Sequence, residues 1–109
     1  MDIDARRHER IIVNIRAELV CGDRRYAGSI ENISPGGVYV VTAPTKSSRD
    51  FAPASVLELR FKFPSGEKMN LHCVVKWSYS TPPHGLTNSV GLEITDPPSA
   101  YKESLKTLL

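Results

Sequence analysis

The sequence has few cysteines, and they are not arranged as a metal site. Cys21 and Cys73 are the only two in 109 residues; they form no CxxC pair, and no histidine lies near either at a ligand spacing. This pattern argues against a zinc site, and we expect no bound metal. Two reduced, buried thiols are the default for a cytoplasmic protein, while a disulfide between them remains an alternative.

Long apolar runs and a strong charge of either sign are also missing. No stretch approaches the ~20 apolar residues that a helix needs to cross a bilayer, and Met1–Ala5 contains no apolar core of a secretory signal. The 14 basic and 12 acidic residues give a formal charge of +2, which is too small to indicate attraction to bulk nucleic acid or an anionic membrane. We therefore expect a cytoplasmic protein with no membrane and no nucleic acid polymer as partner.

Catalytic motifs are absent as well. His8, His72 and His84 are scattered, and none stands in a recognisable triad arrangement with a Ser, Cys or carboxylate. The sequence has no Gly-x-Ser-x-Gly nucleophile elbow, no P-loop and no dinucleotide fingerprint. We expect no enzyme activity and no cofactor.

What the sequence does have is alternation of apolar and polar residues, the pattern of half-buried strands. In the stretch 57–63, Leu and Phe occupy every second position and charged residues lie between them. Similar patterns predict strands at 12–19, 26–33, 38–42, 69–79 and 89–94. In the stretch 69–79 the alternation puts Trp77 and Tyr79 on the same face as Leu71 and Cys73, so both are expected to be buried, and Tyr26 and Tyr39 are likewise interpreted as packing residues.

The period changes after the last strand. Apolar residues Tyr101, Leu105, Leu108 and Leu109 fall at i, i+4, i+7 and i+8, which is one stripe of an amphipathic helix. We predict a helix at about 97–109, capped by Asp96 or Ser99. Six strands followed by one helix indicate an all-β barrel or sandwich with antiparallel strands.

A polar turn, Glu31-Asn-Ile-Ser-Pro-Gly-Gly37, separates two of these strands. Pro35 removes a backbone donor, and the two glycines permit a tight turn with positive φ. Asn32 and Ser34 are one residue apart, so we expect both side chains to face the same way. Taken alone, the stretch is well explained as a hairpin turn in which Asn and Ser bond their own backbone; alternatively, it forms a ledge that a planar ligand can approach.

Residues 1–11 form a second unusual segment, an arm without periodicity. It contains Arg6, Arg7 and Arg10, but acidic residues cancel their charge. A segment built for non-specific attraction to phosphates would be net positive, so these arginines are better interpreted as individual hydrogen-bonding groups. The alternative is a solvated, disordered terminus.

Together the two segments match a known pair of motifs. Arg6 and Arg10 fit RxxxR, and Asn32, Ser34 and Gly37 fit [D/N]xSxxG, in that order in an all-β chain. With the stretches Val74–Trp77 and Val90–Ile94, they make the sequence resemble the PilZ domain family, bacterial receptors for the second messenger cyclic di-GMP. Pro35 and the neutral Asn32, in place of an aspartate, are the two departures to note.

The resemblance implies a six-stranded antiparallel PilZ-type β-barrel at 12–109, with its C-terminal α-helix at about 97–109. The ligand would be held between the arm and the ledge, and ordering of the arm would transmit binding to an unknown protein partner. The implied ligand-binding residues are Arg6, Arg7, Arg10, Asn32, Ser34 and Gly37, with Gly36 and Trp77 as weaker candidates.

Two other functions remain as alternatives. A PilZ-like adaptor would keep the fold but act by protein–protein contact without nucleotide. A small barrel could instead bind single-stranded nucleic acid, but few exposed aromatic residues are expected on the strands and the net charge is low. The sequence leaves open whether the chain forms a homodimer.

Overall fold

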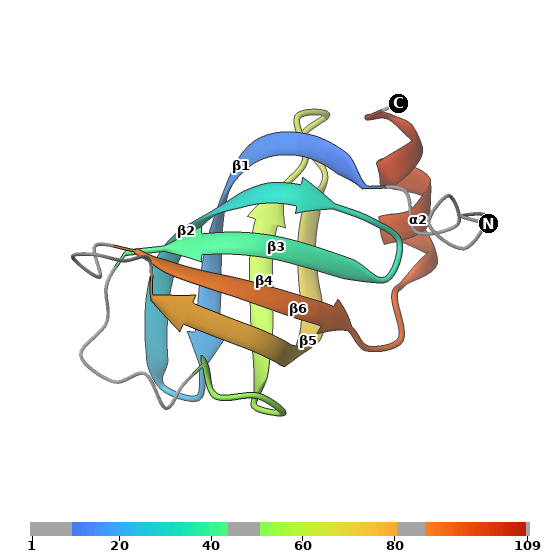
Figure 1. Ribbon diagram of the computed structural model, residues 1–109. Coiled ribbons are helices and arrows are strands. Elements are labelled where there is room, and N and C mark those ends of the chain that lie inside the picture. The colour runs from blue at the N-terminus through green and yellow to red at the C-terminus, as the bar shows by residue number, and fades with distance from the viewer. Residues whose placement is uncertain (1–9, 44–50, 81–86, 109) are drawn as a thin grey trace, which may run out of the picture.

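The structure, a computed structural model, describes residues 10–43, 51–80 and 87–108. Six antiparallel strands close into a barrel in the order β1-β2-β3-β6-β5-β4 (Figure 1). The elements are β1 (Ile11–Cys21), β2 (Arg24–Ile33), β3 (Gly37–Thr42), β4 (Val56–Lys62), β5 (Lys68–Ser80), β6 (Asn88–Ile94) and α2 (Ser99–Lys106). The predicted fold class, an antiparallel six-stranded barrel with a C-terminal helix, is confirmed.

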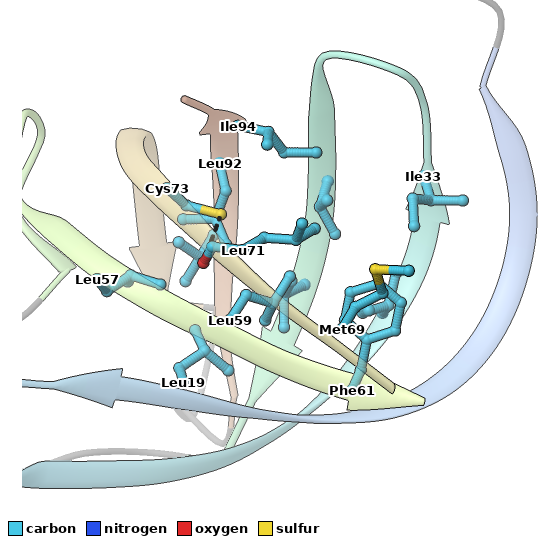
Figure 2. Close-up of a cluster of buried hydrophobic side chains, with 14 of the residues drawn as sticks. Leu19, Ile33, Leu57, Leu59, Phe61, Met69, Leu71, Cys73, Leu92 and Ile94 are labelled. Atoms are coloured by element: carbon cyan, nitrogen blue, oxygen red, sulfur yellow. Dashed lines mark hydrogen bonds between the residues drawn. The ribbon is translucent and has the colours of Figure 1, made fainter. Parts of the chain in front are cut away.

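The barrel interior is filled by the apolar residues of the alternating strands. Leu19, Leu59 and Leu71 are register partners across β1, β4 and β5, and all three are at most 1% exposed. Figure 2 shows them in one cluster with Cys73 and side chains from the other strands. Cys73 is buried and Cys21 half-buried, and no disulfide joins them. Burial of this apolar surface is the main term that stabilises the barrel.

Helix α2 packs against one end of the barrel, beside the turn between β2 and β3 (Figure 1). It is shorter than predicted, and its N-cap is Pro98 with no side-chain hydrogen bond, so the expected cap by Asp96 or Ser99 is wrong. Tyr101 and Leu105 are buried, and the Tyr101 ring lies 6.2 Å from that of Phe63. A helix this short has only marginal stability by itself, so the packing of its apolar side chains against the barrel stabilises it. No helix within the described ranges is long and apolar enough to cross a membrane.

Strand β5 departs from the alternation that the sequence suggests. Its register with β6 shifts between Val75 and Trp77, so that Lys76 is an extra residue on β5. Val75 is buried, but Trp77 is 43% and Tyr79 55% exposed. The prediction that these two aromatic residues share the buried face is wrong, because one inserted residue moves the following side chains to the other face.

Candidate functional site

The two sequence motifs meet at the end of the barrel where β1 begins and β2 ends. Ile11 pairs with Ile33 and Ile12 with Asn32, which brings the preceding residue, Arg10, beside the end of β2. Arg10 Nη1 donates a hydrogen bond of 2.6 Å to Asn32 Oδ1. Because the asparagine carbonyl is neutral, this bond orients the guanidinium without cancelling its charge.

Ser34 determines the shape of the turn that follows. Its backbone N–H donates to the Gly37 carbonyl at 2.9 Å. Its hydroxyl accepts a hydrogen bond from the Gly37 N–H at 3.1 Å and donates to the Gly37 carbonyl at 3.2 Å. The residue is only 4% exposed, so its hydroxyl lies within the turn. Ser34 therefore fixes the position of Gly36 and Gly37 relative to Asn32.

The two glycines of the turn differ in what surrounds them. A Cβ at Gly37 would lie 3.0 Å from the Leu92 carbonyl oxygen and 3.3 Å from Arg10 Nη2, whereas a Cβ at Gly36 would meet nothing within 4 Å. Neither has a positive φ, so the turn does not use the left-handed region that its two glycines permit. Gly37 is needed because the guanidinium and β6 approach it closely.

Helix α2 supports this turn from inside the molecule. The Tyr101 hydroxyl donates a 2.5 Å hydrogen bond to the Ser34 carbonyl, and the residue is completely buried. Burial raises the pKa of Tyr101, the nearby Cys73 raises it further, and the charge of Arg10 lowers it. Since the net direction is upward, the hydroxyl keeps its proton and remains a donor at neutral pH. The second motif is thereby connected to α2.

A pocket of about 340 Å³ lies at the turn; it is lined by Arg10, Ser34, Gly36, Gly37, Lys76, Leu92 and Glu93. A larger depression, about 780 Å³, lies over β1, β2 and β3 but contains none of the motif residues. We place the candidate site at the smaller pocket, because residues of both motifs line it: Arg10 from the first and Ser34, Gly36 and Gly37 from the second. The larger depression is lined by Arg16, Arg60 and Gly28 among others, but by no residue of either motif.

Three aromatic rings extend from this site across the outside of the barrel. Register partners run in one row from Asn32 to Tyr39, Gly91 and Trp77. The Trp77 ring lies 5.6 Å from those of Tyr39 and Tyr79 and stacks on Tyr79. It covers Gly91, where a Cβ would lie 2.3 Å from Trp77 Cε2. We call these three residues the aromatic platform.

Part of this arrangement is predictable from the sequence. The structure brings together Arg10, Asn32, Ser34, Gly36 and Gly37, and it places Trp77 in the adjoining row. Arg6 and Arg7 lie outside the described residues. Tyr79 was missed as a surface residue, because the bulge that exposes it leaves no signal in the alternation. Among residues 10–43, 51–80 and 87–108, no three His, Cys, Asp or Glu side chains cluster to hold a metal ion.

Solved structures with the same fold include the Bacillus subtilis inhibitor of motility, MotI/DgrA. Its TM-score is 0.75 at 19% identity, with 93% of this chain and 47% of that chain covered. MrkH from K. pneumonia in its apo state has a TM-score of 0.72 at 12% identity, with 92% of this chain and 46% of that chain covered. The present chain thus spans about half the length of each.

Sequence comparison gives a more direct result than these distant structures. No curated protein matches the chain significantly. The family described as PilZ domain, however, matches residues 4–109, a range that includes both motifs, all six strands and helix α2. The chain belongs to the PilZ domain family.

Proposed function

We propose that this chain is a receptor for cyclic di-GMP in the bacterial cytoplasm, and that it has no enzyme activity of its own. The observation that carries the proposal is the 2.6 Å hydrogen bond from Arg10 to Asn32. It joins one residue from each of the two motifs that the PilZ resemblance assigns to the ligand. Membership of the family supports the same ligand class.

The proposed ligand is a dianion with two guanine bases, and the site offers a group for each part. A guanidinium can donate two parallel hydrogen bonds to a phosphate or to guanine O6 and N7. Asn32 holds Arg10 in place, and because the asparagine side chain is neutral, it does not cancel the charge of the guanidinium. Ser34 positions the turn, and Gly37, which has no Cβ, lets the Arg10 guanidinium lie close to it. Trp77 offers a partly exposed ring on which a guanine can stack. Arg6 and Arg7 would complete the site from the arm.

Direct binding is tested by calorimetry and by thermal unfolding. At free ligand about 100 times Kd, binding stabilises the folded state by about 2.7 kcal/mol, so we expect the melting temperature to rise on the order of 10 °C for a domain of this size. GTP serves as the control and should give no comparable shift. Absence of binding to cyclic di-GMP would overturn the receptor and favour the adaptor that acts by protein contact alone.

Variants of Arg10 separate hydrogen-bond geometry from charge. Arg10→Ala should weaken binding by about 1–3 kcal/mol, the range for a bidentate arginine contact. Arg10→Lys should restore little of this, because an ammonium can neither fork nor stack. Arg25→Ala, near the opposite end of β2, is the control and should bind normally. If Arg10→Lys binds as well as the unmodified protein, the residue acts only through its charge.

We further propose that ordering of the arm transmits binding to a protein partner. The arginines of the arm would close over the nucleotide, and only the residues in contact should become fixed, since ordering the backbone costs roughly 1–2 kcal/mol per residue. Hydrogen exchange should then show ligand-dependent protection at Arg6–Arg10 and around Asn32–Gly37, with none gained in β4.

A protein truncated to start at Ile11 should keep its melting temperature within a few degrees but lose binding.

A further inference from the structure

An ion pair outside both motifs lines the same pocket as Arg10. Lys76 Nζ lies 3.4 Å from Glu93 Oε1, and both residues contribute to the pocket wall beside Gly36 and Gly37. Glu93 is the register partner of Gly37, the residue beneath the Arg10 guanidinium. The pocket therefore contains two cations and one carboxylate.

The β5 bulge explains why Lys76 and Trp77 both lie on the outer surface. Lys76 is the extra residue between Val75, whose side chain is buried, and Trp77, which lies on the outer surface. A regular strand would continue the alternation through Lys76 and return Trp77 to the interior. With the bulge, Lys76 and Trp77 are consecutive and both exposed, one in the pocket and the other in the aromatic platform.

The ion pair itself is weak enough to be exchanged. The side chains of Lys76 and Glu93 are 58% and 57% exposed, and exposed pairs of this kind contribute little to stability. An anionic ligand in the pocket would be attracted by the ammonium and repelled by the carboxylate. Replacing the carboxylate with a phosphodiester, which also carries one negative charge, therefore loses little and gives the ammonium a partner with oxygen acceptors on the ligand.

We propose that Lys76 is a further cation of the binding site, which contacts a phosphate of the cyclic dinucleotide, and that Glu93 holds its ammonium in the free protein until the ligand replaces it. This inference rests on the proposed function. It assigns to the phosphates a residue that belongs to neither motif, and it assigns to Glu93 the part of a competitor that lowers affinity.

The test is calorimetric titration of the full chain with cyclic di-GMP at low salt. Lys76→Gln should weaken binding about three- to fivefold, and Glu93→Gln should strengthen it about two- to threefold, as expected for a partly exposed charge. Both differences should shrink at ~0.5 M salt, because screening acts on exposed charges. A purely structural effect of either substitution would not depend on salt in this way.

A second pair provides the matched control. Arg25 and Glu18 form an exposed ion pair of 3.9 Å on β1 and β2, away from the turn at Gly37. Glu18→Gln changes the net charge by the same amount as Glu93→Gln, and Arg25→Gln by the same amount as Lys76→Gln. Neither control should change the affinity, and thermal unfolding of all four variants checks that they are folded.

The double variant tests the displacement directly. In a Lys76→Gln background, Glu93→Gln should raise the affinity less than in the unmodified protein, because only the repulsion between carboxylate and ligand is removed and there is no ammonium left to release. An equal gain in both backgrounds would overturn the displacement, and a Lys76→Gln protein that binds normally would overturn the phosphate contact. Weaker binding by Glu93→Gln would overturn the competitor role and make Glu93 an acceptor for the ligand. If the unmodified chain fails to bind at all, it is the proposed receptor function that is wrong.

Discussion

At the scale of single residues, adjacent residues of the same turn have different structural roles. Ser34 and Gly37 bond to each other within the turn, and Gly37 also leaves room for Arg10. Gly36 has open space around it and contributes its backbone, since its carbonyl accepts a 2.9 Å hydrogen bond from the Ile94 N–H. The second glycine of the pair is thus sterically required, and the first is not.

This difference predicts opposite outcomes for two adjacent substitutions. Gly37→Ala introduces a Cβ about 3.0 Å from the Leu92 carbonyl and 3.3 Å from the Arg10 guanidinium, so it should shift β3 or Arg10 and weaken cyclic di-GMP binding by roughly 1–2 kcal/mol. Gly36→Ala should leave binding within about 0.5 kcal/mol, as for a surface site without special contacts. Calorimetry measures both. Equal losses would show that the space above Gly36 is also used by the ligand.

At the scale of elements, the bulge in β5 has the largest consequence for the surface. Before the bulge, Leu71 and the side chains at every second position from it point into the core. After the bulge, the following alternate side chains point outward, and Trp77 covers Gly91 on β6. Bulges are frequent beside functional sites because they redirect side chains without breaking the sheet. Here the redirected residue is Trp77, which joins the aromatic platform next to Lys76 in the pocket.

Stability measurements can distinguish the two faces of β5. Leu71→Ala removes a fully buried side chain and should lower the free energy of unfolding by about 2–5 kcal/mol. Trp77→Ala should lower it by only about 1–2 kcal/mol, since the ring is 43% exposed. Urea unfolding of both variants gives the comparison. A loss for Trp77→Ala as large as that for Leu71→Ala would place the indole in the core.

At the scale of the whole molecule, the closed barrel surrounds groups that can ionise. Burial raises the pKa of the Cys73 thiol from 9.0 to about 12, and it raises that of Tyr101 as well. In the unfolded chain both groups lose their protons at lower pH than in the folded barrel. Folding therefore depends on pH in the alkaline range, where the unfolded state binds fewer protons than the folded one.

The expected result is a fall in stability from about pH 9 upward. The stabilising contribution of Cys73 is fully present below the unfolded pKa of 9.0 and is lost progressively as the pH rises toward 12. Cys73→Ala should make the decline between pH 9 and 11 shallower, even if its stability at pH 7 is lower. Leu71→Ala is the control, which should be less stable but decline as steeply as the unmodified protein. Urea unfolding under reducing conditions at several pH values measures these slopes.

The sequence determined the fold class and the identity of the motifs. Alternation in β1, β4 and β6 is a local property that follows directly from which residues must avoid water, and the interior row of Leu19, Leu59 and Leu71 results from it. The pair RxxxR and [D/N]xSxxG could also be recognised in the printed chain. These signals depend only on residue type and spacing, so they can be recognised without the structure.

Only the tertiary structure decided where the motif side chains point and what adjoins them. Contact between Arg10 and Asn32 depends on strand pairing over 22 residues, and the hydrogen bond from Tyr101 to Ser34 joins residues 67 apart. The register shift at Lys76 appears only when β5 is laid against β6, because a bulge is a property of two strands and not of one. Closure of the barrel therefore placed Lys76 in the pocket and Trp77 on the outer surface, where the alternation of the sequence alone would have placed the tryptophan in the core.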